Sequence, residues 1–183
     1  MGNKMLMKLF VASEAMFFLF LITAFVYYEY SSGFNQQEIH SLDFTSTGIF
    51  TILLILSSGT YWLAERNYKK GQFRMLKIWL LITIILGISF LFGEGREYMH
   101  LFHEQITISK SVFGMNFFTL TGFHGLHVFI WLIVLSITLG LVLAGDFKSK
   151  PSSVIGSVAI YWHFVDIVWI VVFTIIYILP RFA

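Results

Sequence analysis

Five long apolar tracts with very few charged residues dominate this chain of 183 residues. They span approximately residues 5–30, 44–64, 75–95, 115–144 and 154–179. About 20 apolar residues cross the hydrocarbon core of a membrane as a helix, and in lipid the backbone polar groups must bond within their own segment. We therefore expect an all-α, polytopic membrane protein, in which residues 1–183 form a single membrane domain of five transmembrane helices.

The composition supports a lipid environment and excludes several classes of function. Only 12% of the residues are charged, whereas soluble domains carry about 25%. The mean hydropathy is +0.80. The net charge of +2 is too small to indicate a nucleic-acid partner. Because the sequence contains no cysteine, it excludes disulfides, iron–sulfur clusters, thiolate metal sites and cysteine nucleophiles.

The basic residues predict which helix ends face the cytoplasm. With a cytoplasmic N-terminus, nine lysines and arginines fall on the inner side and three on the outer side. The inner set is Lys4, Lys8, Arg66, Lys69, Lys70, Arg74, Lys77, Lys148 and Lys150, and the outer set is Arg96, Lys110 and Arg181. Because cytoplasmic loops are enriched in Lys and Arg, we expect the N-terminus to be cytoplasmic and the C-terminus to lie outside.

Ionisable residues inside the tracts are candidates for function, because placing them in lipid costs about 2.5–3.5 kcal/mol on insertion scales. Glu14 lies in the first tract, His127 in the fourth and His163 in the fifth. With a rise of ~1.5 Å per residue, each lies roughly 12–15 Å from the inner face. We therefore predict a polar layer that joins these three helices.

These intramembrane residues have more than one interpretation. Glu14 is either a proton-relay carboxyl or a neutral, hydrogen-bonded packing carboxyl, and in either role a protonated carboxyl would react with hydrophobic carbodiimides. His124 and His127 share a helical face and form either a metal or haem pair or, as we favour, a pair bonded to carbonyls or carboxyls. Asp166, three residues after His163, is expected to bond that histidine.

Two further polar groups lie near the tract ends or in loops. Glu94, Arg96 and Glu97, at the outer end of the third tract, are expected to pair with one another at a solvated helix end. The loop residues with metal-ligand chemistry are His40, His100, His103 and Glu104. Because they form no complete ligand set, no metal is assigned to this chain.

Three stretches resemble the signature sequences of subunit III of the haem–copper oxidases. They are Ser13-Glu14-Ala15-Met16-Phe17-Phe18, Gly122-Phe123-His124-Gly125-Leu126-His127-Val128 and Tyr161-Trp162-His163-Phe164-Val165-Asp166-Ile167-Val168-Trp169. Ser58-Gly59-Thr60-Tyr61-Trp62 and Glu97-Tyr98 fall in the expected order between them. The resemblance covers nearly the whole chain, and the third stretch is the most specific.

The resemblance implies a non-catalytic subunit of a proton-pumping oxidoreductase, which reduces O2 to water in aerobic respiration with electrons from cytochrome c or quinol. In this family the haem and copper belong to partner subunits. The chain would pack directly against catalytic subunit I, share the complex with subunit II and small subunits, and bind phospholipid. Glu14 would match the family's carbodiimide-reactive carboxyl. The other polar motif residues are His124, His127, His163, Asp166, Trp162 and Glu97.

Longer members of that family have seven helices, and this chain resembles only the last five, which indicates a short bacterial form in the plasma membrane. Two alternatives are an accessory membrane protein of nitric oxide reductase and an independent proton-coupled transporter that uses Glu14 and the histidines. The lack of internal repeats and of broken-helix Gly/Pro signals counts against a transporter. The sequence leaves open the electron donor, the source of the two missing helices and whether Glu14 moves protons.

Overall fold

Helices make up nearly all of the computed structural model, which describes residues 2–32, 36–146 and 154–181. They are α1 (Gly2–Ser32), α2 (Gln36–His40), α3 (Phe44–Lys69), α4 (Phe73–His103), α5 (Val112–Ala144) and α6 (Val154–Phe173). A π-helical turn, η2 (Thr174–Ile178), and a 3-10 turn, η3 (Leu179–Arg181), continue α6. No strand occurs within these three ranges.

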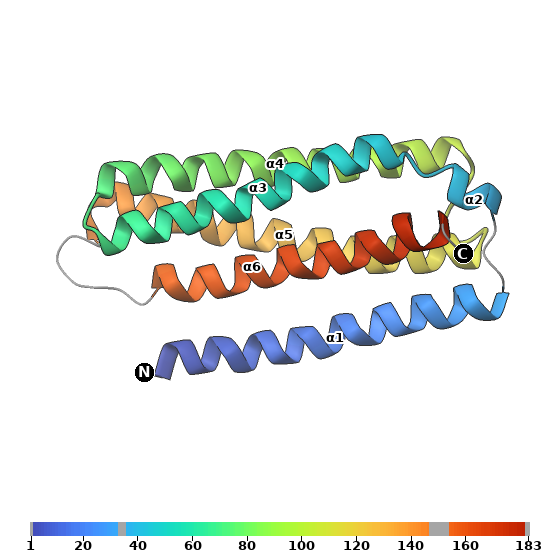
Figure 1. Cartoon of the computed structure of the whole chain (residues 1–183), viewed down its shortest axis with the longest axis horizontal. Coiled ribbons are helices and arrows are strands. Elements are labelled where there is room, and N and C mark those ends of the chain that lie inside the picture. The colour runs from blue at the N-terminus through green and yellow to red at the C-terminus, as the bar shows by residue number, and fades with distance from the viewer. Residues whose placement is uncertain (1, 33–35, 147–153, 182–183) are drawn as a thin grey trace.

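Five of these helices are long and apolar enough to cross a membrane, which confirms the predicted all-α, five-span fold. The start of α1 and the end of η3 lie at opposite ends of the bundle, as an odd number of crossings requires (Figure 1). Which end faces the cytoplasm stays a prediction. Lys148 and Lys150, two of the residues on which that prediction depends, lie outside the described ranges.

Helix α6 is the central helix and α1 is peripheral. Half of the most apolar window of the α6 span is buried, compared with 11% of the corresponding window in α1. Helix α6 packs against α1, α3 and α5, while α3 and α4 form the most extensive pair along their length (Figure 1). Lipid or another protein must therefore cover most of α1.

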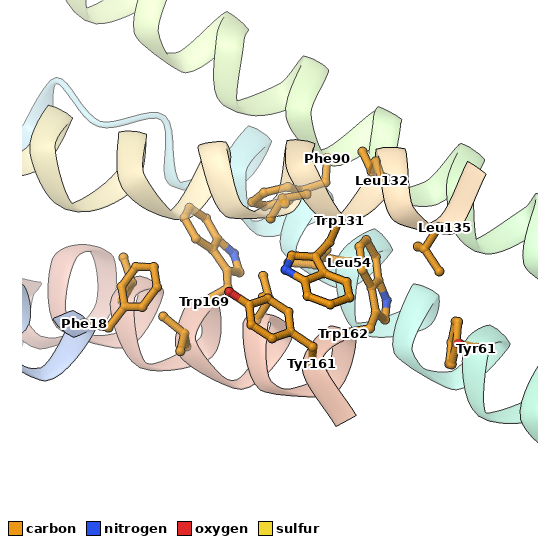
Figure 2. Close-up of a cluster of buried hydrophobic side chains, with 14 of the residues drawn as sticks. Phe18, Leu54, Tyr61, Phe90, Trp131, Leu132, Leu135, Tyr161, Trp162 and Trp169 are labelled. Atoms are coloured by element: carbon orange, nitrogen blue, oxygen red, sulfur yellow. The ribbon is translucent and has the colours of Figure 1, made fainter. Parts of the chain in front are cut away.

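Aromatic side chains fill the centre of the bundle. Trp131 of α5 stacks on Tyr161 of α6 with ring centroids 3.9 Å apart, and Trp162 and Trp169 lie nearby (Figure 2). Between membrane helices the surrounding lipid is as apolar as the core, so close packing supplies the association energy. A Cβ atom added at Gly87 would lie 2.7 Å from a methyl carbon of Leu132, so a larger residue would force that side chain to shift.

The helix ends follow capping chemistry that is readable in the sequence. The Asp43 side chain accepts a hydrogen bond from the Ser46 N–H at the start of α3, with N and O 3.0 Å apart. The Ser111 hydroxyl does the same for Gly114 at the start of α5, at 2.8 Å. Gly145 ends α5 with a left-handed φ of 91°, a conformation that favours glycine.

Several helices extend beyond the apolar tracts that predicted them. Helix α4 continues to His103 although its tract ends near residue 95, and α3 continues to Lys69 although its tract ends near residue 64. In α3, Glu65 pairs with Lys69 at 2.8 Å within this extra turn. The difference arises because hydropathy marks the lipid-embedded part of a helix, whereas charged residues can continue the helix into the interface. The short helix α2 was not predicted.

Candidate functional site

Glu14 and His127 form a pair between α1 and α5. His127 Nε2 lies 2.9 Å from Glu14 Oε2, and the two side chains are 17% and 20% exposed respectively. Glu14 lies nine residues after Met5, where the α1 span begins, or about 14 Å along the helix. The pair therefore lies well inside the hydrocarbon region, where polar groups need partners within the protein.

The second nitrogen of His127 fixes how protons are arranged in this pair. His127 Nδ1 lies 2.6 Å from the Phe123 carbonyl oxygen. A carbonyl only accepts hydrogen bonds, so Nδ1 carries a proton and donates it. Glu14 Oε2 and His127 Nε2 then share one further proton, as carboxylic acid with imidazole or as carboxylate with imidazolium. Both arrangements are neutral overall, which lowers the cost of placing the pair in lipid.

Aromatic rings surround the pair on the α1 side. The Phe18 ring meets His127 edge to face with centroids 5.0 Å apart. The Phe17 ring packs edge to face on Phe123 at 5.1 Å. Phe10, two turns before Phe17 in α1, stacks on Tyr161 of α6 at 5.5 Å. Helix α1 is therefore joined to α5 by this polar pair, and aromatic and other apolar side chains pack around it.

His163 does not join Glu14 and His127. It lies between α3 and α6, where its Nδ1 is 2.5 Å from the Ser58 hydroxyl. The structure thus brings together two of the three residues of the predicted polar layer and places the third at a different helix interface. Equal depth along three helices does not determine which way each side chain faces.

Asp166 is the buried neighbour of the Ser58–His163 pair. The expected Asp166–His163 hydrogen bond is absent, because His163 Nδ1 bonds Ser58 instead. The Ser58 hydroxyl interacts with the Asp166 carboxyl, although neither carboxyl oxygen makes a hydrogen bond of normal geometry within the described residues. Asp166 is 4% exposed, so it lies deeper inside the bundle than Ser58 and His163, which are partly buried.

His124 packs among aromatic rings and makes no pair with His127. Its ring stacks on Trp169 with centroids 4.8 Å apart and meets Phe90 edge-on at 5.8 Å. Both of its ring nitrogens are buried without a partner within the described residues. The hydrogen bonds to carbonyls or carboxyls that we favoured are therefore present for His127 but not for His124.

The tryptophans of the third signature stretch join α6 to α3. Trp162 Nε1–H donates to the Ser57 hydroxyl at 3.2 Å. Trp169 Nε1–H donates to the Thr51 hydroxyl at 2.9 Å. Buried indole N–H groups usually need such a partner. Trp162 is therefore a packing residue that also fixes the register between two helices.

Glu97 and Glu94 lie in an interior cluster, not at the solvated helix end that we expected. Glu97 is 5% exposed, and its Oε1 accepts hydrogen bonds from the Asp43 N–H at 3.1 Å and the Tyr177 hydroxyl at 3.4 Å. Glu94 accepts one from the Tyr98 hydroxyl at 3.2 Å. The four-residue spacing of Glu94 and Tyr98 is the sequence signal that could have indicated this cluster.

Space for the Glu94 side chain comes from Gly125 of α5. A Cβ atom at this position would lie 2.5 Å from a Glu94 carboxyl oxygen. Tyr98 also bonds Thr121 of α5, with the two hydroxyl oxygens 2.9 Å apart. The cluster encloses a cavity of about 10 Å³, roughly the volume needed for one water molecule. It joins α4 to α5 much as the tryptophans join α6 to α3.

The histidines near the end of α4 lie where the helix ends, and His100 makes a hydrogen bond to the backbone there. His100 Nε2 lies 3.0 Å from the Ser41 carbonyl oxygen, which ties the end of α4 to the segment before α3. His103 is the last residue of α4, and Glu104 follows it as the C-cap. Across the described ranges, no group of three or more His, Cys, Asp or Glu side chains is placed to hold a metal ion.

Comparison with known proteins identifies relatives along nearly the whole chain. The family model described as "Cytochrome c oxidase subunit III" matches residues 1–180. The "Probable cytochrome c oxidase subunit 3" of Nocardia farcinica is 37% identical over 170 residues, covering 92% of this chain and 84% of the relative. The corresponding protein of Mycobacterium leprae is 35% identical over 167 residues (91% and 83%). The "Cytochrome c oxidase subunit 3" of Bacillus subtilis is 35% identical over 175 residues (93% and 83%).

Proposed function

The chain belongs to the cytochrome c oxidase subunit III family, and we propose that it acts within its oxidase complex as a non-catalytic scaffold. It is a multi-pass protein of the bacterial plasma membrane and part of a terminal oxidase of the respiratory chain. The observation that carries this conclusion is the family match over residues 1–180, combined with five spans.

The proposed scaffold holds no haem or copper, and these cofactors reside in partner subunits. The chemistry of its histidines supports this assignment, because a metal ligand needs a free ring nitrogen with space beside it. The two ring nitrogens of His124 are enclosed by packed aromatic rings. Both nitrogens of His127 already have hydrogen-bond partners. His163 uses Nδ1 for Ser58 and keeps Nε2 open, but no group of three or more His, Cys, Asp or Glu side chains is placed there to complete a metal site within the described residues. The residues present therefore do not fit a haem or copper site.

Glu14 has a structural role in this proposal, as the carboxyl that joins α1 to the bundle. Its hydrogen bond to His127 links α1 to α5, and the share of α1 that is buried by other helices is small. Without this pair, only apolar contacts, such as those of Met7, Phe10 and Val11, would hold the first half of α1 among the described residues. The pair thus keeps α1 in position at the edge of the subunit.

The partners that we propose are catalytic subunit I in direct contact, subunit II in the same complex, and membrane phospholipid. Large apolar side chains are exposed along all five spans, so both protein and lipid must cover this surface. Between α4 and α5, an open apolar groove is suited to a lipid acyl chain. It is lined by Ile84, Ile88, Leu91, Phe129, Leu132, Ile133, Ser136 and Ile137.

Purification in mild detergent tests the scaffold function. An affinity-tagged chain should copurify with oxidase subunits I and II, identified by mass spectrometry, and the preparation should show the visible spectrum of haem. A tagged, unrelated multi-pass protein from the same membranes serves as the control. Recovery of nitric oxide reductase subunits, or of the chain alone with proton-transport activity in liposomes, would contradict the proposal.

A further inference from the structure

We propose that the surface of α3 and α6 around His163 docks a transmembrane helix of another oxidase subunit, and that this helix supplies a hydrogen bond to His163 Nε2. We call this surface the His163 face. It consists of Ile55, Ser58 and Trp62 of α3 and His163, Ile167 and Ile170 of α6. The inference rests on the proposed function, because it assigns a location to the contact that a complex requires.

One ring nitrogen of His163 lacks a partner. Nδ1 bonds Ser58, whereas Nε2 makes no hydrogen bond to another side chain or carbonyl of the described residues, and the His163 side chain is only partly buried. If Ser58 donates to Nδ1, then Nε2 carries the ring proton and needs an acceptor. If Nδ1 donates to Ser58, then Nε2 needs a donor. In both tautomers, one hydrogen-bonding position of His163 is open toward the outside of the bundle.

The depth of this position favours a protein side chain over bulk solvent as the missing partner. His163 lies nine residues after the start of α6, about 14 Å along the helix. Ser58 lies eleven residues before the end of α3, about 16 Å from that end. The hydrocarbon core is about 30 Å thick, so the pair is near its middle. Bulk water and lipid headgroups lie about 14–16 Å away along the two helices, so the proposal assigns the missing hydrogen bond to a polar side chain of a neighbouring subunit.

The opposite side of the molecule has the properties of a lipid-facing surface. Away from the helix ends, its exposed side chains on α4 and α5 are apolar apart from Ser136, and its hydroxyls bond carbonyls of their own helices. Ser89 donates to the Ile85 carbonyl at 2.9 Å, and Ser136 donates to the Leu132 carbonyl at 2.8 Å. These hydroxyls need nothing from outside the chain, whereas His163 does. The contrast places the protein partner on the α3–α6 side.

Helix α1 does not provide the missing group. It packs on α6 and α5, and its stacking contact with α6 is made through Tyr161. His163 lies on the side of α6 that turns toward α3, as its bond to Ser58 shows. Ile167 and Ile170 follow His163 by four and seven residues, so they continue the same helical face. A partner helix can therefore lie along α3 and α6 and bring a polar side chain to the level of His163.

Site-specific photocrosslinking in the intact complex tests the location of this contact. A photoreactive phenylalanine analogue is placed at Ile167, which is 60% exposed, and for comparison at Ile85 of α4, which is 53% exposed at a similar depth. We expect the Ile167 variant to crosslink to another oxidase subunit and the Ile85 variant to crosslink only to lipid. Protein crosslinks from Ile85 and none from Ile167 would overturn the inference, as would a homodimer formed through Ile167.

Substitution of His163 tests the hydrogen bond. In the tagged complex, His163→Leu should weaken retention of the partner subunit about tenfold across a detergent titration, whereas His163→Gln should retain it. Ser136→Ala, on the lipid-facing side, is the control. The helical circular dichroism of each isolated subunit checks folding. Equal retention in the Leu and Gln variants would overturn the proposed bond. If no oxidase subunit copurifies even with the unchanged chain, the proposed function itself fails.

Discussion

At the scale of single residues, the arrangement of protons in the Glu14–His127 pair determines its properties. The Phe123 carbonyl holds the His127 ring so that Nδ1 donates, which directs Nε2 toward Glu14. The pair then shares one proton and stays neutral overall. This arrangement explains how a carboxyl remains inside an apolar span, and it leads to two predictions.

Glu14 should react with a hydrophobic carbodiimide, because the reaction needs a protonated carboxyl within reach of lipid. Glu65 is a matched control, since both side chains are 20% exposed but Glu65 forms an ion pair with Lys69. Mass spectrometry of the labelled complex should find the adduct on Glu14 and little or none on Glu65. Equal labelling of both residues would show that the proton is not specifically held at Glu14.

His127→Leu should destabilise the subunit by about 1–3 kcal/mol, because Glu14 loses its hydrogen-bond partner inside the membrane. Glu14→Gln should cost less than about 1 kcal/mol, since an amide N–H can donate to Nε2 as the acid does. Unfolding in a denaturing-detergent titration, followed by circular dichroism, measures both changes. If the Gln variant were as unstable as the Leu variant, the pair would require a carboxylate charge.

At the scale of helices, the hydropathy of the sequence determines the five spans but not the direction in which each polar side chain points. Glu14 and His127 were predicted at one depth, and the structure places them in contact. His163 was predicted at the same depth, but the rotation of α6 directs it to Ser58 of α3. Depth follows from counting residues, whereas rotation depends on the packing of large side chains from three neighbouring helices.

The outer cluster was mistaken for a solvated helix end for a related reason. Glu94 and Glu97 are charged residue types near a tract end, and such residues are usually exposed. Their burial depends on partners far away in sequence, including Asp43 and Tyr177. It also depends on the space that Gly125 leaves, which becomes apparent only when α4 and α5 are placed side by side.

Gly125→Ala should therefore destabilise the α4–α5 contact, because the new methyl group would overlap the Glu94 carboxyl. We expect a cost of about 1–3 kcal/mol, typical of overpacking. Gly140→Ala in the same helix is the control, since nothing lies within 4 Å of the added Cβ atom. That variant should be neutral or up to about 1 kcal/mol more stable. Thermal unfolding in detergent measures the stability of both variants. Equal stability of the Gly125→Ala and Gly140→Ala variants would contradict the account.

At the scale of the whole molecule, five crossings place the two chain ends on opposite sides of the membrane. Helix α6 packs against α1, α3 and α5, α1 lies at the edge, and much of the outer surface is apolar. Such a subunit can hold neighbouring subunits in place through its apolar outer surface. This architecture is consistent with a scaffold role in the oxidase.

Reporter fusions test the predicted orientation. Alkaline phosphatase, which folds only outside the cytoplasm, should be active when fused after Ala183 and inactive when fused before Met1. A cytoplasmic fluorescent reporter should give the reverse pattern. The physical reason is the concentration of Lys and Arg at one set of helix ends. Activity of the phosphatase at both ends would contradict five crossings, and activity only at the N-terminus would reverse the orientation.

The central claim is that this subunit supports a redox enzyme without holding a redox centre. It is tested most directly by separating the chain from its purified complex under mild conditions and measuring haem and copper in each fraction. The account predicts that both cofactors stay with the partner subunits, with less than stoichiometric traces on this chain. One haem or one copper ion per chain, retained with an intact spectrum, would contradict it.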